Sequence, residues 1–149
     1  MSHRDIVLAG ALVVATANGV AGLFGGFRWL RSQPSRAFWF GARVGQATAI
    51  AYAALTGVVY LAHWRPTNSL FYLYALLPVA IGFVAEQLRL ISADQILENR
   101  EIESPAAVGL LPPAEQQVLV QAILRRELGV MTAAALVVCF LALRAFGTY

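Results

Sequence analysis

Residues 128–147, LGVMTAAALVVCFLALRAFG, decide the fold class, because this run of 20 residues contains one charged side chain, Arg144. An α-helix needs about 20 mainly apolar residues to cross the hydrocarbon core of a bilayer. Three further runs of similar length and character lie at about 6–27, 44–64 and 70–88. The sequence therefore predicts four transmembrane helices.

The composition of the chain favours the same interpretation. Hydrophobic residues make up 59% of the 149 residues, charged residues make up 13%, and the mean hydropathy is +0.66. Soluble domains average about 45–50% apolar and about 25% charged residues. We expect an all-α, polytopic membrane protein in which residues 1–149 form one antiparallel four-helix bundle surrounded by the lipid bilayer. The formal net charge of +3 is small and scattered, so we expect no nucleic-acid partner.

The first apolar run has one feature of a signal peptide, since Ala15-Thr16-Ala17 fits a small-x-small cleavage site. The residues before it carry one Arg and one Asp, and the run continues to Phe27, which is longer than the apolar part of a signal peptide. We expect this run to be retained as the first transmembrane helix.

The basic residues are all Arg and are unevenly distributed between the loops. Eight lie in or beside the loop after the first span and the long segment between the third and fourth spans: Arg28, Arg31, Arg36, Arg43, Arg89, Arg100, Arg125 and Arg126. Three lie on the other side: Arg4, Arg65 and Arg144. Cytoplasmic loops carry the excess of Arg and Lys. We therefore expect a multi-pass protein of a bacterial plasma membrane with both termini outside.

The largest segment outside the predicted spans is 89–127, which we expect to be cytoplasmic and helical. Ser92 and Gln95 have the spacing of a capping box, which predicts a short helix over 93–102 directly after the third span. The dipeptide Ser104-Pro105 is expected to end that helix, because a residue before proline disfavours helical backbone.

The dipeptide Pro112-Pro113 predicts the start of an amphipathic helix before the fourth span, because proline is tolerated in the first helical turn. This helix either lies on the inner leaflet or continues into the fourth span, with Gly129 as the expected place for a bend. Its apolar face either packs on its own bundle or docks to a partner protein.

Small residues recur every four positions in the second span, at Gly41, Gly45, Ala49, Ala53 and Gly57. The first span repeats this spacing at Gly22 and Gly26, in line with Asn18. Small side chains let two helix backbones approach closely. These stripes predict a helix-packing seam between the first and second spans or, alternatively, a seam between two copies of the chain.

Polar side chains within the predicted spans define a candidate intramembrane site: Asn18, Arg43, Gln46, Glu86 and Arg89. Arg43 and Glu86 lie near the cytoplasmic ends of neighbouring antiparallel spans, so their charges are at matching depth. Charges in a membrane usually have a partner. We expect an ion pair with added hydrogen bonds from Gln46 and Gln87. The alternatives are separate snorkelling to the interface, a structural lock, and a site for an ion or substrate.

Signatures of catalysis, cofactor binding and metal binding are missing from the sequence. It contains no GxSxG, phosphate-loop or HExxH motif. Its histidines are His3 and His63, and its single cysteine is Cys139. We therefore expect neither an enzyme nor a bound cofactor. An axial haem ligand would have to be His63, at the outer end of the second span.

Three stretches carry a resemblance to a known group: LAHWRPTNSLFYLYALLP at 61–78, AEQLR at 85–89 and ILRRELGVM at 123–131. They resemble uncharacterised four-span membrane proteins of GC-rich actinobacteria. The resemblance implies a four-span fold and brings no activity or site residue with it.

Three classes of function are compatible with these features. The first is a non-catalytic structural protein, either a homo-oligomer or an accessory subunit of a larger membrane assembly. The second is an oligomeric small channel or transporter, for which Asn18, Thr48, Tyr52 and Thr56 would have to face a shared axis; the hydroxyls of that row could instead form hydrogen bonds between helices. The third is a haem-binding electron-transfer protein.

The predicted topology can be tested with an impermeant thiol reagent on intact cells. A Pro34→Cys variant should be protected, because the Arg distribution places the first loop in the cytoplasm, whereas a Ser2→Cys variant should be labelled. The reverse labelling pattern would contradict the orientation.

Overall fold

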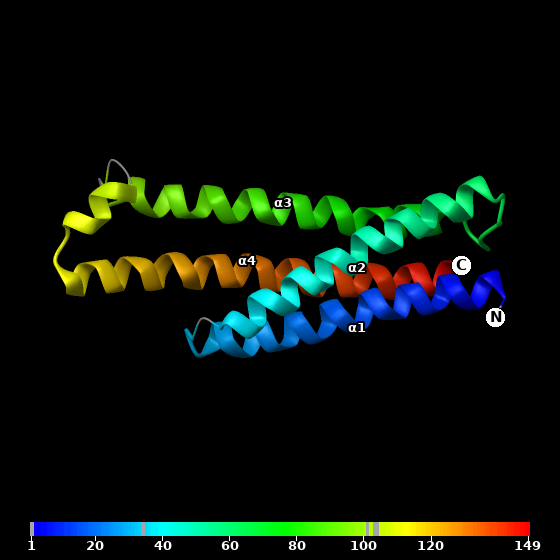
Figure 1. Ribbon diagram of the computed structural model, residues 1–149, viewed down its shortest axis with the longest axis horizontal. Coiled ribbons are helices and arrows are strands. Elements are labelled where there is room, and N and C mark those ends of the chain that lie inside the picture. Colours follow the sequence, from blue (N-terminus) through cyan, green and yellow to red (C-terminus); the bar gives the residue numbers. More distant parts are fainter. Residues whose placement is uncertain (1, 34, 101, 103–104) are drawn as a thin grey trace.

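The computed structural model describes residues 2–33, 35–100, 102 and 105–149. These residues form four long α-helices and one short 3-10 helix, and no strand occurs among them (Figure 1). The helices are α1 (His3–Leu30), α2 (Arg36–Leu61), α3 (Leu70–Glu98), η1 (Pro105–Leu110) and α4 (Pro113–Thr148). Each α-helix is long and apolar enough to cross a membrane. The predicted all-α class and the four candidate spans are confirmed.

The four α-helices differ in how extensively they contact one another. α4 makes the most extensive contacts, with α1 on one side and α3 on the other, and α2 packs mainly on α1. α2 crosses the bundle obliquely, from the end of α1 towards the beginning of α3, and its contact with α3 is sparse (Figure 1). Both chain termini lie at one end of the bundle.

The prediction of a separate helix over 93–102 is wrong, because α3 continues without a break to Glu98. Ser92 is buried within this helix, where the neighbouring N–H groups already have partners in the preceding turn. A capping serine acts only at a helix start, where N–H groups are free. Ser104, the expected end of the short helix, lies outside the described residues.

The amphipathic segment after Pro113 extends the fourth span, since α4 is one helix of 36 residues. This helix runs through Gly129 without interruption. A Cβ atom at Gly129 would lie 2.9 Å from the indole nitrogen of Trp29 in α1. This glycine therefore makes room for an aromatic ring of the neighbouring helix.

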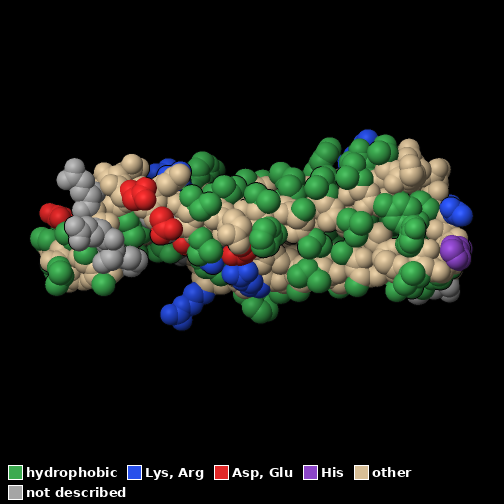
Figure 2. All heavy atoms as spheres, turned by 90° about the horizontal axis from the view of Figure 1, so that it is seen from above, with side chains coloured by type: hydrophobic (Ala, Val, Ile, Leu, Met, Phe, Trp, Pro, Cys, Tyr) green, Lys and Arg blue, Asp and Glu red, His purple; other side chains and the backbone are tan. Residues whose placement is uncertain are grey.

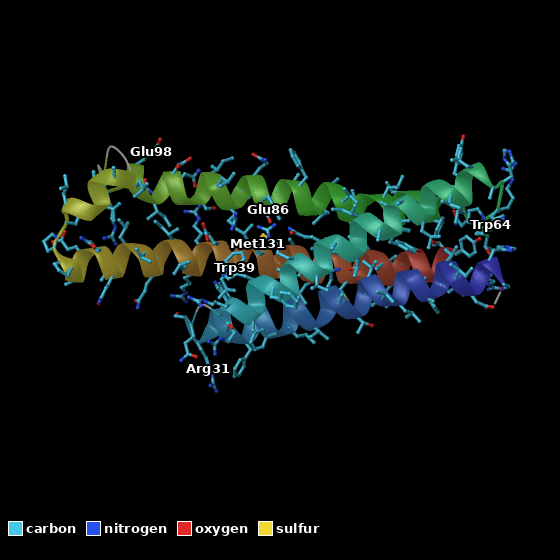
Figure 3. All side chains as sticks on the ribbon, in the orientation of Figure 1. Arg31, Trp39, Trp64, Glu86, Glu98 and Met131 are labelled. Carbon is cyan, nitrogen blue, oxygen red and sulfur yellow. The ribbon has the colours of Figure 1, made fainter. Side chains whose placement is uncertain are left out.

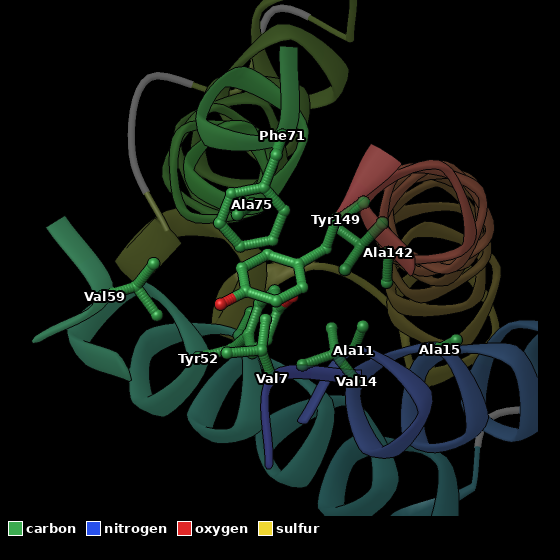
Figure 4. Packing of buried hydrophobic residues seen from close by; sticks show 13 residues of the cluster. Val7, Ala11, Val14, Ala15, Tyr52, Val59, Phe71, Ala75, Ala142 and Tyr149 are labelled. Atoms are coloured by element: carbon green, nitrogen blue, oxygen red, sulfur yellow. The ribbon is translucent and has the colours of Figure 1, made fainter. Parts of the chain in front are cut away.

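Aromatic rings lie among small valine and alanine side chains in the core near the end that carries the termini (Figure 4). The rings of Phe71 and Tyr149 have centroids 4.9 Å apart, and Tyr52 meets Phe71 at 6.5 Å. The N–H groups of Thr67 and Asn68 donate to the main-chain oxygens of Tyr149 and Thr148 at 3.0 and 3.1 Å. The loop between α2 and α3 therefore supplies partners for oxygens that the end of α4 leaves free.

The two predicted small-residue stripes have different partners. Asn18 in α1 donates to the Gly45 carbonyl in α2 at 3.1 Å and to the Val14 carbonyl at 2.9 Å, so Gly45 lies in a seam between α1 and α2. Gly22 and Gly26 face Leu136 and Thr132 of α4. Their expected packing on the second span is therefore wrong.

The rest of the α2 stripe becomes less buried towards its end. Ala49 is buried and Ala53 is half-buried. A Cβ atom added to Gly41 would lie 3.7 Å from the Cβ atom of Ala21 in α1, whereas one added to Gly57 would meet no atom within 4 Å. Of the three glycines in this stripe, Gly45 therefore approaches α1 most closely.

A Gly45→Leu substitution should destabilise the bundle. An added Cβ atom would lie 2.6 Å from Oδ1 of Asn18, and overpacking of this kind typically costs about 1–3 kcal/mol. Thermal unfolding in detergent should show a lower Tm. Gly57→Leu is the matched control on the same helix, and equal melting of the two variants would show that the seam is not tightly packed.

Candidate functional site

A cluster of polar side chains connects α2 to α3, and we call Arg43, Gln46, Glu86 and Arg89 the Glu86 cluster. Oε1 of Glu86 accepts hydrogen bonds from Nη1 of Arg43 at 2.6 Å and from Nε2 of Gln46 at 2.9 Å. Nη1 of Arg43 also donates to Oε1 of Gln46 at 2.8 Å. Two residues one turn apart on α2 therefore share one carboxylate on α3.

Arg89 completes the cluster from the turn of α3 that follows Glu86. Its Nη2 lies 3.2 Å from Oε2 of Glu86, and its guanidinium lies over the ring of Trp39 at 5.4 Å. In Figure 3, Trp39 of α2, Glu86 of α3 and Met131 of α4 lie near one another in the middle of the molecule. Nε of Arg89 is buried and has no hydrogen-bond partner among the described residues.

The ion pair between Arg43 and Glu86 that the sequence predicts is present. The side chain of Glu86 is 23% exposed and that of Arg43 is 54% exposed, so the pair lies at a partly open surface. Gln87, which was also expected to contribute a hydrogen bond, is exposed. The Glu86 cluster thus contains four of the five predicted polar residues. The fifth, Asn18, lies in the α1–α2 seam.

A cavity of about 300 Å³ lies next to the Glu86 cluster, and we call it the α2–α3 cavity. Its wall consists of side chains from α2, α3 and α4, with Asn18 of α1 also lining it. Gln46 and Glu86 supply its other polar groups, and the remaining lining residues are apolar, including Ile50, Phe83 and Val138. The sequence does not predict this cavity, because no periodic pattern indicates that α2 diverges from α3.

The hydroxyl groups of Thr48 and Thr56 form hydrogen bonds within α2 rather than between helices, contrary to one expectation. Thr48 donates to the Gly45 carbonyl at 2.8 Å and Thr56 donates to the Tyr52 carbonyl at 2.9 Å, both within α2. A threonine in a helix reaches the carbonyl three or four residues back without any second helix. The hydroxyl of Tyr52 is buried and has no partner among the described residues.

The geometry of the Glu86 cluster fits a structural connection. One carboxylate faces donors from three side chains, so the carboxylate is already well satisfied and holds α2 and α3 together. In the part of the chain that the structure describes, no group of three or more His, Cys, Asp or Glu side chains could hold a metal ion.

No family model, curated protein or solved structure matches this chain. The fold and the site together define an all-α protein with four helices that could span a membrane, in which a partly exposed polar cluster joins α2 to α3. Its function must be inferred from its own residues.

A double-mutant cycle can measure the coupling across the Glu86 cluster. Arg43→Ala and Glu86→Ala should each lower the free energy of unfolding, and the double variant should lose less than the sum of the two. Residues in one ion-pair network typically couple by about 0.5–3 kcal/mol. Reversible unfolding in mixed detergent micelles gives the three values.

The control cycle pairs Glu86→Ala with Arg65→Ala, since Arg65 lies in the loop between α2 and α3 at the opposite end of the bundle. Distant pairs are additive within about 0.5 kcal/mol. Additivity in the Arg43–Glu86 cycle as well would show that the two side chains act independently.

Proposed function

We propose that the protein is a non-catalytic, multi-pass protein of a bacterial plasma membrane that acts as a structural or accessory subunit, within a larger membrane assembly or as a homo-oligomer. Both termini lie outside in this proposal. The resemblance to four-span actinobacterial proteins fits it and adds no activity.

The observation that carries the proposal is the unequal length of the helices. α4 has 36 residues, which at 1.5 Å per residue correspond to about 54 Å. The hydrocarbon core of a bilayer is about 30 Å thick. α3 and α4 continue past the turn between α1 and α2, and η1 joins them at the tip (Figure 1). We call the described residues of this part, 90–100, 102 and 105–127, the α3–α4 extension.

Charged side chains support an aqueous location for the α3–α4 extension. Acidic side chains gather at this end in Figure 2, while the rest of that face is largely hydrophobic. The charged residues of α3 and α4 in this stretch include Asp94, Glu98, Glu115, Arg125 and Arg126. Such a set would be expensive in hydrocarbon. By the Arg distribution, the compartment is the cytoplasm.

Apolar side chains nevertheless remain exposed on this extension. Leu90 and Ile91 of α3, Leu110 of η1, and Val118 and Val120 of α4 are between 46% and 88% exposed. A helix pair in water would normally bury such residues, and a contiguous apolar patch rimmed by charged groups is typical of protein contact sites. This supports a partner surface, on another protein or on a second copy of the chain.

The channel alternative finds less support in the arrangement of its polar side chains. Asn18, Tyr52 and Thr56 are each no more than 3% exposed, because they lie inside the four-helix bundle. A pore on a shared oligomer axis needs polar groups on the outer surface. The haem alternative depends on His63, which is exposed beyond the end of α2.

Photo-crosslinking in cells can test the proposed contact surface. A photoreactive amino acid at Leu110 or Val118 should give protein adducts, since these positions are exposed on the α3–α4 extension. Leu23 is the control, because it is 72% exposed on α1 within a candidate membrane span. Mass spectrometry of the adducts then distinguishes a second copy from a different partner. If neither Leu110 nor Val118 gives an adduct above that of Leu23, the accessory role is wrong.

A further inference from the structure

The α2–α3 cavity opens at the surface of the bundle. Ile50 of α2 and Phe83 of α3 both line it, and they are 60% and 66% exposed. The cavity therefore opens between these two helices, where their contact is sparse. Both residues belong to candidate membrane spans, so the opening faces lipid tails in the proposed membrane setting.

The size and lining of the α2–α3 cavity restrict what can enter it. Ligand pockets in proteins usually range from about 300 to 1,000 Å³, so this cavity of about 300 Å³ is at the small end. A whole helix, about 10–12 Å across with its side chains, is too wide for such a space. The apolar wall, formed by residues such as Val79, Met131 and Val138, favours a narrow hydrocarbon chain over a polar solute.

Glu86 lines the α2–α3 cavity and pairs with two arginines that stand next to the cavity, outside its lining, and the charges of this cluster do not balance. Arg43 and Arg89 provide two positive charges against the single negative charge of Glu86. The side chain of Arg43 is more than half exposed, and Nε of Arg89 has no hydrogen-bond partner within the described part of the chain. An anion beside these guanidinium groups would balance the charge and accept hydrogen bonds. The Arg distribution places this end at the cytoplasmic interface, where phosphate groups lie.

We propose that the α2–α3 cavity binds one acyl chain of an anionic phospholipid, whose phosphate group lies beside Arg43 and Arg89. The chain enters from the bilayer between Ile50 and Phe83. The inference rests on the proposed membrane location, and it is independent of the partner surface on the α3–α4 extension. Failure of one proposal therefore leaves the other in place.

Gly82 provides a way to fill the cavity without disturbing the fold. This residue lines the cavity, and a Cβ atom added to it would meet no atom within 4 Å. A Gly82→Leu side chain can thus occupy the space that the acyl chain would use. Gly57→Leu is the matched control, because its Cβ atom also meets nothing within 4 Å and Gly57 does not line this cavity.

Native mass spectrometry of the purified, full-length protein measures the binding. The protein in non-ionic detergent is titrated with dioleoyl-phosphatidylglycerol or with dioleoyl-phosphatidylcholine. The two lipids have the same acyl chains, but the headgroup of phosphatidylcholine is zwitterionic. We expect one phosphatidylglycerol to be retained in preference to phosphatidylcholine. Gly82→Leu should weaken this retention about tenfold or more, equivalent to at least about 1.4 kcal/mol, while Gly57→Leu should leave it unchanged. The melting temperatures of both variants verify that they fold.

The headgroup is tested separately from the acyl chain. Arg43→Gln should reduce the preference for phosphatidylglycerol over phosphatidylcholine, whereas Arg65→Gln, at the other end of the bundle, should not. Inorganic phosphate should fail to displace the lipid, because it lacks the chain.

Three results would overturn the proposal. They are equal lipid retention by the Gly82→Leu and Gly57→Leu variants, equal retention of the two lipids by the unmodified protein, and a dimer that dissociates only in the Gly82→Leu variant. The last result would show that the α2–α3 cavity is part of an interface between two copies of the chain.

Discussion

Glu86 of α3 accepts hydrogen bonds from Arg43 and Gln46 of α2, and the relation between the two helices depends on this carboxylate. The first half of α2 lies towards α1, so a side chain of α2 must be long to reach Glu86 of α3 at that level. Arg43 and Gln46 are long enough to do so. The α2–α3 cavity is the space that this bridge leaves beside it. The polar cluster and the cavity thus have one cause, the oblique path of α2.

The features that the sequence predicted correctly are those determined by local composition and by the position of a residue along the helix axis. Long apolar runs are enough to indicate four helices, because an uninterrupted run of about 20 apolar residues is typical of a membrane-spanning helix and of no other secondary structure. The Arg43–Glu86 pair can be predicted because antiparallel neighbours bring the beginning of α2 to the level of the last turns of α3. Position along a helix axis can be read from residue number at 1.5 Å per residue.

The features that were missed depend on which helices are neighbours and on where a helix ends. Gly22 and Gly26 mark a close-packing face of α1, but their spacing does not indicate which helix packs there. In the structure this helix is α4, where α2 was expected. Ser92 and Gln95 have capping chemistry but lie in the last two turns of α3, where the pairing with α4 keeps the backbone helical. Tertiary contacts override a local signal in both cases. The α2–α3 cavity had no signal at all, since it results from the divergence of two helices.

The extensive contact of α4 with α1 has a consequence for biosynthesis. Membrane helices are inserted in order as the chain is made, and their association follows insertion. In the proposed membrane setting, Gly22 and Gly26 of α1 have no cover until the last helix arrives. The nascent protein thus passes through a three-helix stage whose closest-packing face is open to other membrane chains. The insertion machinery must shield that face, or deliver α4 quickly, for the bundle to close on itself.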